Sequence, residues 1–166
     1  ERIKKIFCFN PYDYDNKFAE GVSRGNLISK ILFFHMRLPF GIGYFFSKLE
    51  CSPILWVIMR GGVYNKKSIT FSYIKNLCEA LSKKYFTLHE RNVFNNFKSW
   101  SNHAENYKDI TVPLSLIYGK YDWSKIKERE RTMTSLGLNS FKTLDNSGHF
   151  SFHESSELVS EIILNK

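Results

Sequence analysis

The sequence predicts an α/β fold in which a short parallel sheet is interrupted by a long helical insertion. Apolar runs typical of buried strands occur near residues 3–9, 114–118 and 140–145. About eighty residues between the first and second runs carry only helical periodicity. The remainder of the chain follows a strand–helix–strand order, and its crossover is long enough for parallel pairing.

Length and charge limit the class of protein. A chain of 166 residues is a natural size for one domain, and 43% hydrophobic and 16% aromatic residues supply a core. The net charge is +8, but basic residues occur as isolated pairs such as Lys4 and Lys5. A nucleic-acid groove needs clustered basic and aromatic side chains. We therefore expect no nucleic-acid partner, and attraction to an anionic membrane surface has weak support.

Cysteine usage and hydropathy favour a cytoplasmic protein without a membrane span. Cys8, Cys51 and Cys78 are far apart and form no CxxC pair, as expected of free thiols in a reducing compartment. The longest stretches without a charged residue are ten residues, for example residues 38–47, whereas a span needs about twenty. No signal peptide is evident. The chain opens at Glu1 and runs directly into a strand, which is typical of a partial sequence.

The first strand is expected over residues 3–9, where Ile6 begins a continuous apolar run. Asn10 and Pro11 end it, because proline has no N–H for a sheet ladder. Residues 12–25 are rich in Asp, Asn and Gly, which predicts a polar loop.

Helices are expected throughout residues 26–104. Pro39 can open one at its first position, where no N–H is needed. Ser52 begins another, and Gly61 ends it. Stripes at helical spacing recur along this region: Leu27, Ile28, Ile31, Leu32 and His35; Ile74, Leu77, Cys78 and Leu81; Phe86, Val93, Phe94, Phe97 and Trp100. The insertion therefore has an unusually aromatic lining.

Sheet character returns in the last part of the chain. A strand is expected at residues 114–118, a charged helix over about 124–136, and a short strand over 140–144. A terminal amphipathic helix is marked by Leu158, Val159, Ile162 and Ile163.

Two polar side chains follow the second and third strands. Asp122 comes just after Gly119, and His149 directly follows Gly148. Carboxyl ends of parallel strands meet at one sheet edge, where such sheets bind ligands. The crossover therefore brings the carboxylate and the imidazole within hydrogen-bonding reach, as in the acid and base of a hydrolytic triad. Asp122 could instead cap the following helix, and His149 could be a hydrogen-bonded loop histidine.

A longer pattern surrounds both residues: Ile110-x-Val112-Pro113-x-x-Leu116-Ile117-Tyr118-Gly119-x-x-Asp122-Trp123, then Gly148-His149-Phe150, then Glu154. It resembles the end of an α/β-hydrolase fold protein. The run Ile6-Phe7-x-Phe9-Asn10-Pro11-Tyr12-Asp13-Tyr14 is similar to that family's sixth strand and cap entry. The resemblance implies an α/β core over residues 1–15 and 110–166, with a helical cap over 16–109. It also implies that Asp122 is the triad acid and His149 the triad base.

The nucleophile departs from that family's pattern. Gly21-Val22-Ser23-Arg24-Gly25 has the Gly-x-Ser-x-Gly spacing of a nucleophile elbow, in the right chain order. An elbow must follow a buried strand, however, and residues 15–20 are polar and charged. We therefore expect Ser23 to serve its loop or cap a helix, and the nucleophile to lie upstream of this chain.

Other candidate residues have less support. Asp13 or Asp15 could replace Asp122, because in some family members the acid follows the sixth strand. His149 and His153 have an H-x₃-H spacing but no partnered ligands, so neither a metal nor a cofactor is expected. The remaining histidines are expected to be structural or solvent-facing: His35, His89 and His103.

These observations predict a hydrolase of the α/β-hydrolase type, acting on an ester or similar small apolar substrate. An upstream nucleophile attacks, His149 moves the proton and Asp122 orients His149. The family also has aspartate nucleophiles, so the nucleophile's type stays open. This segment alone is expected to be inactive. The alternative is a non-catalytic binding module, whose basic aromatic cap docks on a membrane surface or a protein partner.

Overall fold

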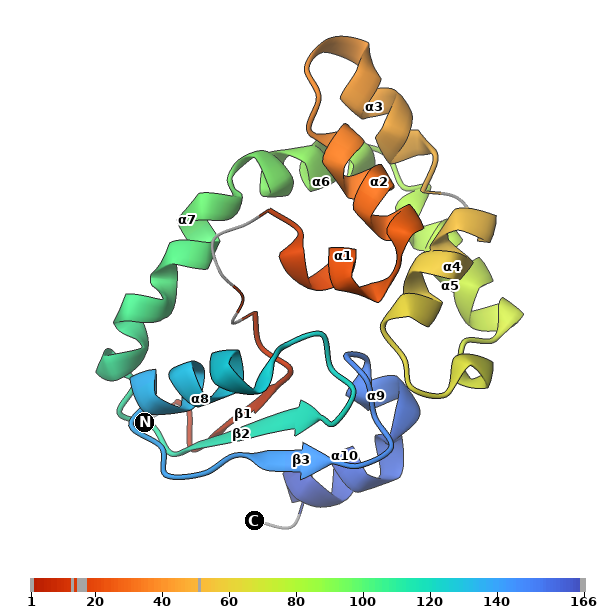
Figure 1. Ribbon diagram of the computed structural model, residues 1–166. Coiled ribbons are helices and arrows are strands. Elements are labelled where there is room, and N and C mark those ends of the chain that lie inside the picture. Colours follow the sequence, from red (N-terminus) through yellow and green to blue (C-terminus); the bar gives the residue numbers. More distant parts are fainter. Residues whose placement is uncertain (1, 13, 15–17, 51, 165–166) are drawn as a thin grey trace. The chain divides into compact units, whose positions relative to one another are not determined.

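The computed structural model describes residues 2–12, 14, 18–50 and 52–164. They divide into two compact units (Figure 1). The sheet unit comprises Glu1–Tyr14, Gly62–Ser68 and Ser101–Lys166, and the helical unit comprises Asp15–Gly61 and Ile69–Trp100. A small parallel sheet together with many helices makes this an α/β protein, which confirms the predicted class.

The sheet has three strands in the spatial order β1 (Ile6–Phe9), β2 (Leu114–Gly119) and β3 (Lys142–Leu144). Both neighbouring pairs are parallel, with Cys8 opposite Leu116 and Tyr118 opposite Thr143. The predicted parallel pairing is confirmed. The central strand β2 is buried on both faces, which explains its continuous rather than alternating apolar run.

Both outer strands are shorter than the sequence predicts. The first begins at Ile6 rather than Ile3, and Ile3 is 56% exposed. The ladder stops there because the neighbouring chain is Pro113, which has a carbonyl to accept from Ile6 N (2.9 Å) but no N–H to donate. The third strand begins at Lys142, where pairing with Ile117 starts.

Helices cover both faces of the sheet (Figure 1). On one face, Val159 packs against Ile117 and Leu144. Tyr118 points to the other face because side chains alternate along a strand, and there its ring lies 5.0 Å from the Arg129 guanidinium. The helical elements of this unit are η1 (Lys66–Ser68), η2 (Asn102–Asp109), α8 (Ile126–Ser135), α9 (Ser151–Glu154) and α10 (Ser156–Leu164).

The helical unit contains no strand among its described residues, as predicted. Its core is Leu32, Phe33, Met36 and Ile58. Asn26 begins the second helix by accepting a hydrogen bond from Ser29 N at 2.9 Å. The helices are α1 (Glu20–Gly25), α2 (Leu27–Met36), α3 (Phe40–Lys48), α4 (Ser52–Gly61), α5 (Phe71–Leu81), α6 (Phe86–Asn95) and α7 (Phe97–Ser101).

The loop predicted for residues 12–25 is wrong over its last six residues, because Glu20–Gly25 forms helix α1. Local side-chain interactions stabilise it: Arg24 Nη2 lies 2.6 Å from Glu20 Oε1, one helical turn away. Composition alone favoured a loop, since two glycines and a serine lie within these six residues. Asp13 and Asp15, the alternative acids, lie outside the described residues.

The helices of the helical unit are short for a membrane span. No single helix in the described part of the chain is long and apolar enough to cross a bilayer. Gly41–Lys48 and Pro53–Gly61 reach the required length and composition only when taken together across an 82° bend.

Candidate active site

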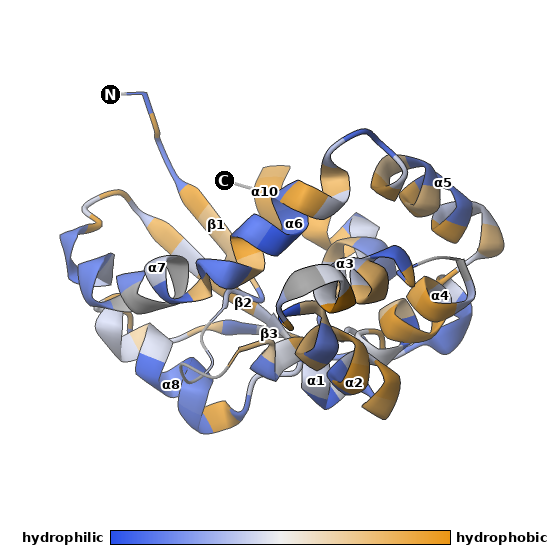
Figure 2. Cartoon of the chain, turned by 90° about the horizontal axis from the view of Figure 1, so that it is seen from above, coloured by the Kyte–Doolittle hydropathy of each residue, from blue (hydrophilic) through white to orange (hydrophobic). Residues whose placement is uncertain are grey.

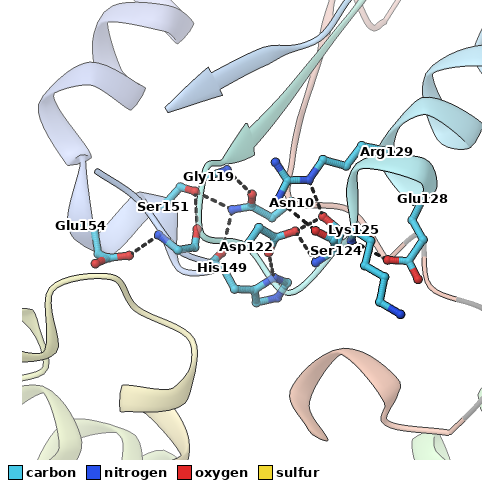
Figure 3. Close-up of polar contacts among 11 residues, drawn as sticks. Asn10, Gly119, Asp122, Ser124, Lys125, Glu128, Arg129, His149, Ser151 and Glu154 are labelled. Carbon is cyan, nitrogen blue, oxygen red and sulfur yellow. Dashed lines mark hydrogen bonds and ion pairs between the residues drawn. The ribbon is translucent and has the colours of Figure 1, made fainter. Parts of the chain in front are cut away.

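Asp122 lies in the turn that leaves the carboxyl end of β2. Its main-chain N–H donates to Gly119 O at 3.1 Å, which closes the turn. Its side chain is fully buried, and Oδ1 lies 2.6 Å from His149 Nδ1 (Figure 3). Oδ2 accepts hydrogen bonds from Ser124 N at 3.1 Å and from the Ser124 hydroxyl. Asp122 does not cap a helix, because α8 begins four residues later and Lys125 occupies its N-cap.

His149 lies in the loop after β3, and three contacts hold it. Its main-chain N–H donates to Gly62 O at 2.7 Å. Its imidazole stacks on Trp123, with ring centroids 4.0 Å apart and an interplanar angle of 17°. The side chain is 21% exposed, and within the described part of the chain no residue hydrogen-bonds its Nε2. The ring is therefore oriented through Nδ1, and the side chain as a whole is partly exposed.

The structure thus brings together the two residues that sequence spacing paired. Twenty-seven positions separate them along the chain. Because β2 and β3 are adjacent and parallel, their exit loops lie at the same sheet edge. The predicted contact between the carboxylate and the imidazole is confirmed.

The environment keeps Asp122 ionised. Burial alone would raise the pKa of its carboxyl, but the hydrogen bond and charge of His149, together with the two hydrogen bonds from Ser124, outweigh that penalty. The pKa of Asp122 therefore lies below its ordinary value. An ionised carboxylate stabilises the positive charge that a neighbouring imidazole acquires on taking a proton.

Ser124 links the carboxylate to a buried cation. Arg129 Nε donates to Ser124 Oγ at 3.0 Å, and Arg129 Nη2 donates to Ser124 O at 3.0 Å. Since Arg129 occupies the Ser124 oxygen as a donor, the Ser124 hydroxyl proton is directed at Asp122. Figure 3 shows this chain of contacts on the side of Asp122 away from His149. The arrangement fixes the carboxylate and places a positive charge behind it.

Asn10 connects all three strand ends, and sequence reasoning missed this role. Its side-chain Oδ1 accepts from Gly119 N at 2.7 Å, and Nδ2 donates to His149 O at 2.7 Å and to Ser151 Oγ at 2.5 Å (Figure 3). Its φ is 42°, a left-handed conformation that asparagine tolerates better than most residues. An Asn following a buried strand, at the edge where Asp122 and His149 lie, was the available signal.

Glu154 fixes the histidine loop from its other side. Its Oε2 accepts from Gly148 N at 2.6 Å, and its Oε1 accepts from Asn65 N at 2.7 Å. The loops after β2 and β3 are packed so closely that a Cβ on Gly119 would lie 2.1 Å from Gly148 O. The position of His149 is therefore set by backbone contacts as well as by its side chain.

Ser23 does not have the geometry of a nucleophile elbow. It lies inside helix α1, and its hydroxyl donates to Glu20 O at 2.9 Å. No strand in the described residues precedes it except β1, which ends at Phe9. These observations agree with the expectation that the Gly-x-Ser-x-Gly match is fortuitous.

Two of the other candidate histidines contact backbone carbonyl oxygens. His153 Nε2 lies 2.6 Å from Ser68 O, and His35 Nδ1 lies 2.7 Å from Ile31 O. Cys8 and Cys78 form no disulfide, and Cys51 lies outside the described residues. Among the residues that the structure describes, no group of three His, Cys, Asp or Glu side chains could hold a metal ion.

Comparison with known proteins finds no family model that matches this chain, and no curated protein that matches it.

Proposed function

We propose that Asp122 and His149 are the acid and base of a triad of the α/β-hydrolase type, in a protein that hydrolyses an ester or similar small apolar substrate. The observation that carries the proposal is the 2.6 Å contact between Asp122 Oδ1 and His149 Nδ1 at the carboxyl edge of a parallel sheet. Burial of the acid and partial exposure of the base support it, because only the imidazole needs to reach a substrate.

The geometry supports a defined proton path. Nδ1–H donates to the ionised Asp122, which leaves the lone pair of Nε2 free to accept a proton from a nucleophile. The imidazolium formed is stabilised by Asp122 on its edge and by the face of Trp123, since aromatic faces attract cations. Return of the proton from Nε2 to the leaving group completes acyl transfer to the nucleophile, and water then releases the acid.

The proposal requires a nucleophile beside Nε2, and Ser23 does not fit because its hydroxyl is used within α1. We place the nucleophile in sequence that precedes Glu1. It is either a serine on a strand-to-helix elbow, whose proton Nε2 accepts, or an aspartate, in which case Nε2 accepts a proton from the water that releases the product. The 166-residue chain then supplies the acid, the base and a helical insertion, and does not turn over substrate by itself.

The test compares hydrolysis of a short-chain nitrophenyl ester by this chain and by a form carrying the coding sequence that precedes Glu1. We expect turnover only in the longer form. His149→Ala should lower kcat/KM by about 10⁶-fold, and Asp122→Asn should lower it by about 10⁴-fold. Ser23→Ala and His89→Ala serve as matched controls and should leave it unchanged.

A second measurement tests the pair itself in the 166-residue chain. ¹⁵N NMR should show His149 as the Nδ1–H tautomer, and Asp122→Ala should abolish that preference. Two results would contradict the proposed enzyme. One is that the longer form still hydrolyses the ester after His149→Ala. The other is that the longer form does not hydrolyse the ester and its added sequence contains no strand followed by a nucleophile elbow. The latter result would favour a non-catalytic binding module.

A further inference from the structure

The helical unit exposes an unusual amount of apolar surface on two consecutive helices. Figure 2 shows hydrophobic colour running along α2. We call this region the α2–α3 surface, and its members are the exposed large apolar side chains Leu27, Ile28, Ile31, Phe34, Ile42, Tyr44 and Phe45. A globular protein seldom exposes so many large apolar side chains together without a partner for them.

Helix α2 is apolar on both of its faces. Leu32, Phe33 and Met36 are buried in the core. Leu27 and Phe34 lie on the opposite side of the helix, where they are 69% and 65% exposed. A helix that is hydrophobic all round normally has its second face covered as well.

Charge identifies the kind of partner that covers it. Residues 27–48 contain Lys30, Arg37 and Lys48, and no aspartate or glutamate. Lys48 Nζ lies 5.5 Å from the centre of the exposed Tyr44 ring. Exposed apolar side chains bordered by lysine, arginine and tyrosine are the pattern of surfaces that lie in the interface of anionic bilayers.

A cavity of about 560 Å³ opens beside the exposed end of α2. Phe18 and Phe34 contribute its apolar wall, and Lys30, Arg24 and Arg37 contribute positive charge. The only carboxylate among its lining residues, Glu20, is paired with Arg24 at 2.6 Å. The excess positive charge is therefore that of Lys30 and Arg37, which suits a phosphate group.

We propose that the α2–α3 surface docks on an anionic phospholipid bilayer, with its apolar side chains in the interface and Lys30 and Arg37 against lipid phosphates. The bilayer supplies apolar and anionic groups together, and both are needed to complement this surface. A second copy of the chain supplies no such excess of negative charge, because its net charge is +8. The docking is independent of the proposed hydrolytic chemistry.

The test is co-sedimentation of the 166-residue chain with vesicles of phosphatidylcholine alone or mixed with phosphatidylserine, at low and high salt. We expect binding to the mixed vesicles that weakens with salt, and little binding to phosphatidylcholine alone. Phe34→Glu and Lys30→Glu should each weaken the binding about tenfold. Inorganic phosphate at matched ionic strength should not compete, because a free anion lacks the apolar component.

Two matched controls make the result specific. Phe71→Glu replaces a phenylalanine that is 75% exposed at the start of α5, and Lys83→Glu reverses an exposed lysine just after α5. Both should bind as the wild type does, and circular dichroism should confirm that all four variants fold. The proposal is overturned if the folded wild type ignores the mixed vesicles, or if the controls weaken binding as much as the α2 variants. It is also overturned if size-exclusion chromatography shows a dimer that Phe34→Glu dissociates, without any vesicle binding.

Discussion

The two units differ in the sequence separation between the residues that their side-chain hydrogen bonds join. In the sheet unit, Asn10 bonds residues more than one hundred positions away, and Glu154 bonds Asn65 across 89 positions. In the helical unit most such bonds are local, as between Ser82 and Glu79. The loops at the sheet edge are therefore positioned by directional contacts, whereas the helices are positioned mainly by apolar packing.

Buried polar atoms show the same difference. Ser47 Oγ, Glu50 Oε2 and Arg91 Nε, all in the helical unit, are buried without a hydrogen-bond partner. At the sheet edge, by contrast, both Asp122 oxygens and both Asn10 side-chain atoms are satisfied. A catalytic pair needs angstrom-level positioning, and a docking surface does not. The contrast agrees with placing chemistry in one unit and docking in the other.

The largest expected effect comes from Gly119→Ala, because a Cβ there would lie 2.1 Å from Gly148 O and 2.5 Å from Ser147 O. Neither atom is the end of a flexible side chain, so the loops must separate, and we expect a loss of about 3–5 kcal/mol in the free energy of unfolding. Gly41→Ala on α3 is the matched control, since its Cβ meets nothing within 4 Å. That variant should gain about 0.5–1 kcal/mol. Urea unfolding measures both, and equal effects would show that the loops are loosely packed.

Asn10→Ala tests whether long-range hydrogen bonds hold the sheet edge. It leaves Gly119 N–H and His149 C=O buried without their partner, which should cost about 3 kcal/mol. Asn26→Ala removes the N-cap of α2, the bond from the Ser29 hydroxyl to Asn26 Oδ1 and one bond to Val57 O, and should cost about 1 kcal/mol. Hydrogen exchange of individual amides assigns each loss to its unit. If Asn26→Ala lowers the free energy of unfolding as much as Asn10→Ala does, long-range hydrogen bonds do not matter more in the sheet unit than in the helical unit.

The sequence predicted much of the sheet unit because its information is local. Apolar runs locate strands, and the long crossover determines that β2 and β3 are parallel, which places Asp122 beside His149. The bonds of Asn10 were not predictable in this way, because they depend on the register of all three strands together. Helix α1 was missed because Val22 packs against the core of the helical unit, a tertiary contact that composition does not reveal.

Periodicity also could not predict which apolar side chains of α2 are exposed to solvent. The stripe of α2 predicted a buried face, and Leu32 is indeed buried. It also contains Leu27, Ile28 and Ile31, which are exposed. Because α2 is apolar all round, hydropathy alone does not say which side faces the core. Coordinates were needed to recognise the α2–α3 surface.

Asp122→Asn tests how the ionised Asp122 carboxylate makes the stability of the sheet unit depend on pH. The pKa of Asp122 is lowered in the folded chain, so its ionised form contributes stability above the ordinary value of 3.8, and this contribution is lost as pH falls through the folded pKa. The variant should lose about 1–3 kcal/mol near neutral pH and converge with the wild type in acid. Urea unfolding, followed by hydrogen exchange in the sheet unit, measures the difference at each pH. A gap between the two proteins that stays constant down to pH values well below 3.8 would contradict the role given to the ionised carboxylate.

Glu90→Gln should produce the smallest effect, with the opposite dependence on pH. Burial first, and then the hydrogen bond and charge of Glu50, raise the pKa of Glu90 from 4.5 to about 9. A raised folded pKa means that the contribution to stability is complete below 4.5 and is lost as pH rises through about 9. Glutamine keeps the hydrogen-bonding shape without the charge, so the variant should become more stable than the wild type as pH rises, by about 1 kcal/mol because the site is partly exposed.

The matched control for this experiment is Glu79→Gln, which changes an exposed glutamate of α5 in the same unit and should leave the wild-type profile intact. Lys48, which lines the same cavity as Glu50, and Arg91, which follows Glu90 in the sequence, are retained in both variants. If acid lowers the stability of the sheet unit and alkali lowers that of the helical unit, then different ionisable groups determine the pH dependence of the two units. Identical pH profiles for Glu90→Gln and the wild type would contradict the raised pKa of Glu90.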